Sequence, residues 1–282
     1  NDQLRKAKLD EARDFASNWH GKADGRITTM MSPHSPYTCP PRFIEQIVDA
    51  AVQLGLPIHT HMSETLTEVE QNVTEYGKRP VQHLLDLGVF ERPSLVAHAV
   101  HLTDEEIQIL ADHKVHVSHN PGSNLKLASG IARVPELLEA GVVVSLGTDS
   151  SASNNNLDML EEIRLAALLH KGQSKDPTVV PAMKALQMGT LDGAHALWLE
   201  RLGELKEGAR ADLIAMDMDQ PHFYPRSNLI SHVVYAASAA DVTDVWVNGK
   251  RIVKNKAVLT LDEEKVKAEF QARFEGLMAT DG

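Results

Sequence analysis

The chain has 282 residues and a formal net charge of -11 at pH 7, enough length for one large α/β domain with an accessory region. The acidic balance, without a cluster of lysines and arginines, argues against nucleic acid and anionic membranes as partners. Cys39 is the only cysteine, which excludes an internal disulfide and a zinc site built from several thiolates. No apolar run approaches a membrane span and no secretory signal begins the chain, so we expect a cytoplasmic protein.

Strands and helices alternate along the first two thirds of the chain. Apolar runs predict strands at residues 26–31, 57–61, 94–101, 115–119 and 142–146. Apolar residues at the helical period predict helices at residues 41–54, 66–76, 81–87, 105–113, 133–140, 157–171 and 180–188. Residues 120–124 are expected to form a polar loop.

Each predicted strand ends near a polar side chain, and these residues are His34, His61, His98, His119 and Asp149. The alternation favours an α/β fold, a (β/α)8 TIM barrel whose active site lies at the C-terminal ends of its strands. A full barrel needs about 250 residues and eight strands. We therefore expect the N-terminal strands, about three βα units, to be missing from this chain.

From about residue 202 the pattern changes to short strands. Antiparallel strands are predicted at 203–208 and 211–216, and Asn248-Gly249 between two apolar runs predicts a hairpin. A helix is expected from Glu263 to Phe274. We expect two parts, a barrel region at 1–201 and a small β-sandwich accessory region with a C-terminal helix at 202–282.

The stretch around His59, His61 and Glu64 carries the most informative chemistry. Residues two apart on a strand share a face, so both histidines point inward, and Glu64 lies just past the strand end. Imidazole is the commonest metal ligand in proteins, and a nearby carboxylate can move the protons of a water molecule. The alternative is that both histidines are hydrogen-bonded core residues.

Asp149 follows an apolar strand and Gly-Thr, a position where it can bind metal or accept a proton. Its alternative role is an N-cap, although the next helix is expected to begin only near Leu157. His98 and His101 compete for one role, and the alternation along the strand favours His98. His34 and His119 also face the expected barrel mouth, but spacing alone does not decide their roles.

Other kinds of active site are excluded by the sequence. A single cysteine rules out the Cys-x-x-Cys zinc site of cytidine-type deaminases, and Gly-x-Gly-x-x-Gly, Walker and Gly-x-Ser-x-Gly motifs are absent. Histidines and carboxylates at strand ends remain, which is typical of a mononuclear metal hydrolase.

Five stretches carry a family resemblance: residues 33–39, 61–65, 97–98, 118–127 and 147–155. They resemble the amidohydrolase superfamily, most closely the 5-methylthioadenosine/S-adenosylhomocysteine deaminases. The resemblance implies one divalent metal, Zn2+ or alternatively Fe2+, bound by His61 and Asp149. Two further ligands in this family form a His-x-His on the first barrel strand, which this sequence lacks.

The resemblance also implies a reaction, the hydrolytic deamination of an adenine ring with release of ammonia. Glu64 would contact the substrate ring and shuttle protons, with His98 and Asp149 as its catalytic partners, and His34 would bind the nucleoside. The implied partner is a small nucleoside substrate, in a homo-oligomer. Alternatives are another amidohydrolase, such as a triazine chlorohydrolase or guanine deaminase, or a non-catalytic fragment without the first-strand ligands.

Overall fold

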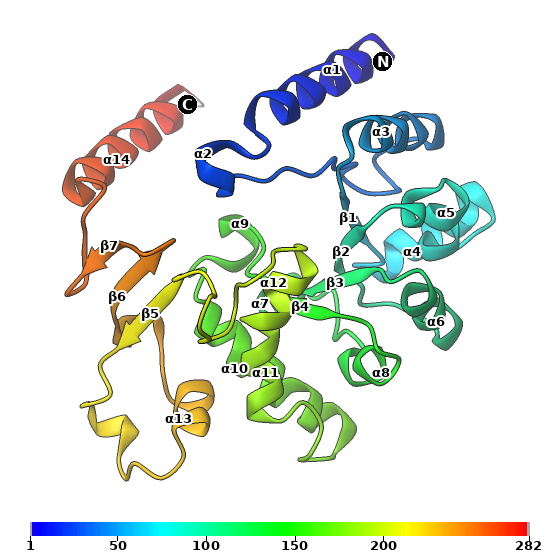
Figure 1. Ribbon diagram of the computed structural model, residues 1–282. Coiled ribbons are helices and arrows are strands. Elements are labelled where there is room, and N and C mark those ends of the chain that lie inside the picture. Colours follow the sequence, from blue (N-terminus) through cyan, green and yellow to red (C-terminus); the bar gives the residue numbers. More distant parts are fainter. Residues whose placement is uncertain (1, 281–282) are drawn as a thin grey trace. The chain divides into compact units, whose positions relative to one another are not determined.

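The computed structural model describes residues 2–280, and the chain divides into two compact units, Asn1–Glu200 and Arg201–Gly282 (Figure 1). Each unit is described by itself. Among the residues described, no helix is long and apolar enough to cross a membrane.

The first unit is built on a parallel sheet of four strands in the order β1-β2-β3-β4. Their bounds are β1 Ile58–Met62, β2 Ser94–His98, β3 His116–His119 and β4 Val144–Leu146. One register row across the sheet joins Thr60, Val96, Val117 and Val144, and all four side chains are buried. Strands buried on both faces are expected to be apolar, which is why these runs could be recognised in the sequence.

The strand expected at 26–31 is reduced to an isolated parallel bridge between Met31 and Ile58. Met31 donates its N–H to Pro57 O and accepts from His59 N, so the chain does lie beside β1. Pro33 and Pro36 have no N–H to donate, and a proline cannot continue a strand ladder. The segment therefore runs on as an irregular loop that carries His34 to the end of β1.

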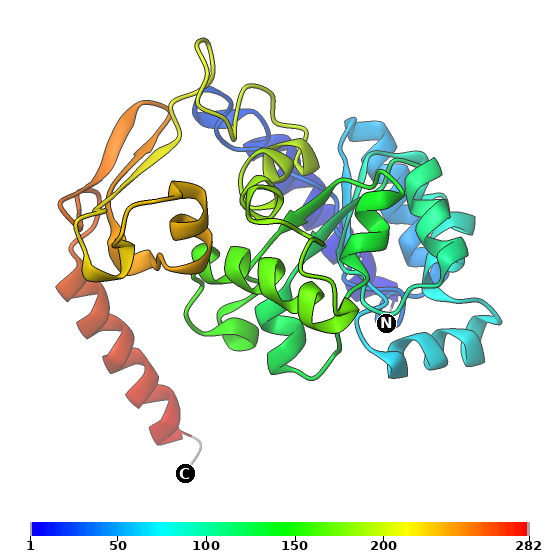
Figure 2. The ribbon, with the colours of Figure 1, turned by 90° about the horizontal axis from the view of Figure 1, so that it is seen from below.

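Helices follow the strands: α3 to α6 form one group near β1 and β2, and α10 to α12 pack beside β4 (Figures 1 and 2). The helical segments are α1 Asp2–Trp19, α2 Lys22–Gly25, α3 Pro41–Leu54, α4 Leu66–Tyr76, α5 Pro80–Asp86, η1 Val89–Glu91, α6 Asp104–Asp112, α7 Pro121–Lys126, α8 Val134–Glu139, α9 Ser151–Asn154, α10 Met159–Ser174, α11 Ala182–Met188 and α12 Leu191–Ala196.

The helix ends follow local sequence rules. Gly55 ends α3 in the left-handed conformation, with φ 67°, and Thr65 caps α4 by accepting from Glu68 N. Thr103 and Glu106 form the full capping box of α6. The prediction of a loop at 120–124 is wrong. Pro121 suits the first turn of a helix, and it begins the short helix α7.

The second unit contains an antiparallel sheet in the order β5-β6-β7-β8. Its elements are β5 Leu213–Met216, η2 Pro221–Phe223, α13 Leu229–Tyr235, η3 Ala239–Asp241, β6 Val242–Val247, β7 Lys250–Lys254, β8 Ala257–Val258 and α14 Glu263–Thr280. Asn248 and Gly249 both have positive φ, 49° and 77°, as the tight hairpin turn between β6 and β7 requires.

The prediction of a strand at 203–208 is wrong, because this segment contains a turn in which Ala209 N bonds to Lys206 O. Gly203 and Gly208 both have positive φ, which interrupts extended backbone. The described residues of the second unit hold this one sheet, so a β-sandwich stays a prediction.

Candidate active site at the strand ends

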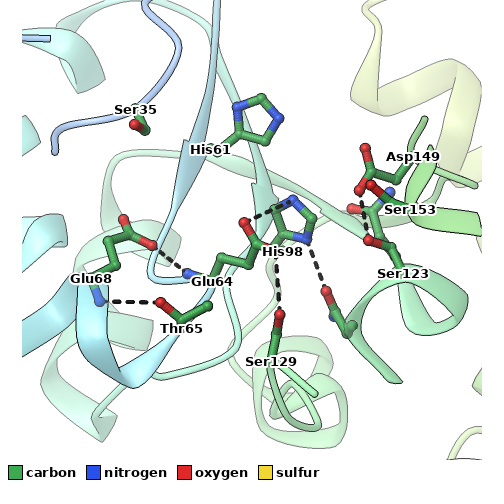
Figure 3. A network of polar contacts seen from close by, with 12 residues as sticks. Ser35, His61, Glu64, Thr65, Glu68, His98, Ser123, Ser129, Asp149 and Ser153 are labelled. Atoms are coloured by element: carbon green, nitrogen blue, oxygen red, sulfur yellow. Dashed lines mark hydrogen bonds and ion pairs between the residues drawn. The ribbon is translucent and has the colours of Figure 1, made fainter. Parts of the chain in front are cut away.

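Side chains from three strand ends meet around one histidine ring. His98 is the last residue of β2, and its Nε2 lies 3.7 Å from Glu64 Oε2, just past β1. The His61 ring stacks on the His98 ring at a centroid distance of 5.5 Å. Figure 3 shows Asp149, from the loop after β4, on the other side of His98 from Glu64. The structure thus brings together four residues that the sequence predicted as a site.

Three of these segments turn through left-handed backbone. Ser63, His98 and Asp149 have φ of 52°, 72° and 64°, a region that residues with a Cβ seldom adopt. Each such residue costs of order 1–3 kcal/mol, and such conformations cluster at functional sites. Each of these residues lies at or just after a strand end, where the chain leaves the sheet.

Glu68 holds the turn that presents Glu64. Its carboxylate accepts from Ser63 N at 3.0 Å and from Glu64 N at 2.7 Å, and the side chain is buried in the first turn of α4 (Figure 3). Burial raises the pKa of Glu68, although the hydrogen bonds from Glu64 N and Ser63 N act in the opposite direction. Sequence reasoning missed this residue because it looks like an ordinary helix position.

The proton on His61 is fixed by a backbone carbonyl. His61 Nδ1 lies 2.7 Å from His34 O, which can only accept, so Nδ1 carries the proton and Nε2 keeps its lone pair. Metal-binding histidines usually donate their other ring N–H in this way. The His34 ring lies 4.9 Å from the His61 ring, and burial together with the nearby His61 lowers the pKa of His34.

Asp149 is kept as a carboxylate by its neighbours. Its Oδ2 accepts from Ser123 Oγ at 2.6 Å and its Oδ1 from Ser150 N at 2.7 Å. Burial alone would raise the pKa of Asp149, but these hydrogen bonds and the nearby His98 outweigh it and lower the pKa. The next helix, α9, begins at Ser151, earlier than expected, and Ser150 is its N-cap, so Asp149 does not cap it.

One short segment after β3 supplies partners to all three acid–base groups. Ser123 donates to Asp149, Asn124 Oδ1 lies 2.8 Å from His98 Nδ1, and Ser129 Oγ donates to Glu64 Oε1 at 3.2 Å. The sequence signal for this segment was a run of small polar residues after a strand. It predicted a loop but gave no sign of which side chains it would contact.

Glu162 of α10 hydrogen-bonds to this segment. Glu162, 1% exposed, accepts from Gly122 N at 2.9 Å and from Asn154 Nδ2 at 2.7 Å. It therefore links α7, after β3, to α9, after β4. Burial raises the pKa of Glu162, against the effect of these two hydrogen bonds.

The model of the amidohydrolase family matches residues 1–252, far more than half of the chain. The chain belongs to the amidohydrolase family. It is 53% identical over 265 residues to the 5-methylthioadenosine/S-adenosylhomocysteine deaminase of Dictyoglomus thermophilum and 53% identical over 269 residues to that of Pelotomaculum thermopropionicum. These matches cover 94% and 95% of the chain, which spans 62% of each relative's length.

Solved structures show the same fold as this amidohydrolase. A zinc-bound adenosine deaminase from Xanthomonas campestris matches with a TM-score of 0.92 at 36% identity, covering 96% of the chain and 62% of that structure. An atrazine chlorohydrolase from Arthrobacter aurescens complexed with zinc matches with a TM-score of 0.87 at 27% identity, over 94% of the chain and 59% of that structure. The TM-scores support the TIM-barrel type of fold.

Four other histidines of this amidohydrolase make different contacts. His101 belongs to the loop after β2, where its Nε2 bonds to Ser129 O at 2.7 Å, and the His59 ring lies 6.0 Å from that of His61. His119 is buried with its Nε2 3.3 Å from His170 Nε2. Burial lowers the pKa of His119 well below its usual value and that of His170 to about 4, so both rings are neutral near pH 7.

The donor set fits part of a zinc site. The free Nε2 of His61 and the ionised carboxylate of Asp149 are both ligand types that zinc accepts. Within residues 2–280, no group of three or more histidine, cysteine, aspartate or glutamate side chains is arranged to hold a metal. The family is metal-dependent and zinc is bound in the two solved relatives, so this pair fits a site that needs further ligands.

Proposed function

We propose that the whole protein is a metal-dependent hydrolytic deaminase that converts the adenine ring of S-adenosylhomocysteine or 5-methylthioadenosine to the hypoxanthine form. The observation that supports it most is the cluster of Glu64, His98 and Asp149 beside the free Nε2 of His61. The names of the relatives at about 50% identity supply the substrate class.

The reaction adds water at the amine-bearing ring carbon, expels ammonia and leaves a carbonyl. Glu64 donates a proton to the adjacent ring nitrogen, which makes that carbon more electrophilic. Ser129 Oγ, bonded to Oε1, and the turn held by Glu68 orient the carboxyl group for this transfer.

Two further groups handle the proton of the attacking water. Asp149, whose pKa is held low, accepts it, and His98 takes up the proton and passes it to the leaving amine. His34, at the mouth of the site, contacts the nucleoside. His61 and Asp149, with further ligands, would hold a divalent metal, Zn2+ in the first instance and Fe2+ as the alternative, and a bound metal would lower the pKa of its water toward neutral pH.

The protein around this site is part of the same proposal. A complete eight-stranded barrel with first-strand ligands is consistent with the chain spanning 62% of the relative's length. We also propose a small β-sandwich accessory region at 202–282, a homo-oligomer and a cytoplasmic location. Light scattering of the purified full-length protein tests the oligomer, and metal analysis distinguishes zinc from iron.

The test of function is product release by the full-length, zinc-loaded protein. S-adenosylhomocysteine and 5-methylthioadenosine should release ammonia, whereas a chlorotriazine should release little chloride. Glu64→Gln keeps the shape but removes the proton, so kcat/KM should fall by about 10^2 to 10^4-fold.

The matched control is Glu70→Gln, on the exposed face of α4, which should keep wild-type activity. Wild-type rates in Glu64→Gln would refute the role of Glu64. If the protein released chloride faster than ammonia, the chlorohydrolase alternative would replace the deaminase. If the protein bound no metal after reconstitution, the alternative of a non-catalytic protein would be supported.

A further inference from the structure

The two ring nitrogens of His98 meet different acceptors. Nδ1 lies 2.8 Å from Asn124 Oδ1, a normal hydrogen-bond distance, whereas Nε2 lies 3.7 Å from Glu64 Oε2, too far for one. The ring is buried, with 1% of its surface exposed, so solvent does not compete for either nitrogen. A neutral imidazole has one proton, and the two acceptors decide which nitrogen carries it.

Asn124 is held firmly enough to make that choice. It is 1% exposed and lies in α7, where its N–H bonds to Asn120 O at 2.9 Å and its carbonyl accepts from Ser129 N at 2.8 Å. The same segment carries the partners of Glu64 and Asp149, so a shift of Asn124 alone would need α7 to deform.

We propose that Asn124 is a positioning residue that holds His98 as the Nδ1–H tautomer and so presents the unprotonated Nε2 to Glu64 and the reacting groups. The inference rests on the proposed function for its kinetic consequence but not for the tautomer itself. Without the Asn124 acceptor, the proton moves to Nε2, where Glu64 is the nearest acceptor, and the ring can no longer accept a proton from the reaction.

The orientation of the Asn124 side-chain amide decides which nitrogen of His98 carries the proton. Asn124 Nδ2 is buried and has no hydrogen-bond partner within the described part of the chain. If the amide were turned round, Nδ2 would donate to His98 Nδ1 and the proton would lie on Nε2. The two arrangements predict opposite tautomers, which makes them distinguishable by experiment.

The tautomer is measured by long-range proton–nitrogen NMR of the zinc-loaded full-length protein labelled with 15N-histidine. The His98 signals are assigned by their loss in His98→Gln. We expect a protonated Nδ1 and an unprotonated Nε2 in the wild type, and the reverse in Asn124→Leu. A protonated Nε2 in the wild type, or an unchanged Nδ1–H in Asn124→Leu, would overturn the proposal whether or not the protein is a deaminase.

Kinetics then test the consequence. Asn124→Leu should lower kcat by about 10- to 100-fold with a much smaller change in KM, because the base is affected and not the binding of substrate. Asn124→Asp, which keeps an acceptor at Nδ1, should restore the tautomer and part of kcat.

Asn72→Leu is the control for burial. Asn72 is also 1% exposed but donates to Lys78 O and contacts His83, away from the strand ends. It should lose stability without a loss of kcat. Equal losses of kcat in the two leucine variants would refute a specific role for Asn124.

Discussion

Gly122 tests how tightly the segment after β3 is held. A Cβ built on Gly122 would lie 2.3 Å from Glu162 Oε1 and 2.7 Å from Asn154 Nδ2, far inside contact distance. Its φ is not in the left-handed region, so alanine meets no backbone penalty there and only the clash matters. Since Glu162 is buried, Gly122→Ala has to break one or both hydrogen bonds to that carboxylate.

The expected cost follows from those bonds. A hydrogen bond to a charged group contributes about 1.5–3 kcal/mol, and the gain in helix propensity from glycine to alanine is at most about 1 kcal/mol. We expect Gly122→Ala to lower the free energy of unfolding by about 2 kcal/mol. For a unit of this size the Tm should fall by roughly 4–8 °C.

Urea unfolding of wild type and variant measures the change, and Gly172→Ala is the matched control. Gly172 lies in α10, exposed, with nothing within 4 Å of a built Cβ. Alanine there should stabilise the protein by about 0.5–1 kcal/mol. If Gly122→Ala were as stable as the wild type, the Glu162 contacts would not hold this segment and the reasoning would fail.

Three further predictions concern the metal, pH and the turn after β1. His61→Asn should lower the zinc content of the full-length protein by metal analysis, whereas His59→Asn should retain it. Burial holds the pKa of His170 at about 4, so stability present above pH 6.5 should be lost as the pH falls toward 4, by up to about 3 kcal/mol. Glu68→Gln turns an amide donor toward one of two backbone N–H groups and should cost about 1–3 kcal/mol in urea unfolding.

Each has a clear contrary result. Equal zinc loss in the His59 and His61 variants would remove the distinction between them. If His170→Gln lost as much stability as the wild type between pH 6.5 and pH 4, protonation of another residue would cause the loss. Wild-type stability in Glu68→Gln would mean that the Ser63 turn holds without the carboxylate.

The fold was predictable where local physics decides it. Buried parallel strands need apolar runs, and α3 and α4 end at Gly55 and Gly77, the residues that the sequence marks as helix ends. The strand expected at 26–31 failed, since Ile27 and Thr29 hydrogen-bond to the residues just after α1 and only Met31 bridges to β1. The helix α12 was missed because six residues give too short a pattern to recognise.

The site was predictable one residue at a time but not as a network. His61, His98 and Asp149 each follow an apolar run, and that position is visible in a linear sequence. Their partners are not, because Ser123 and Asp149 are 26 residues apart, as are His98 and Asn124, and no periodicity links them. Glu68 and Glu162 looked like surface helix residues, and only the folded chain buries them.

The left-handed turns after β1 and β2 stabilise each other. Ala99 N bonds to Met62 O at 3.1 Å, and Val100 N and His101 N both bond to Ser63 O at 3.0 Å. These backbone bonds offset the cost of positive φ at Ser63 and His98 without using either catalytic side chain. The approach of Glu64 to His98 is therefore set by the main chain, so removing one side chain should leave the other in place. For that reason, the kinetic losses of Glu64→Gln and Asn124→Leu can be interpreted as chemistry and not as collapse of the site.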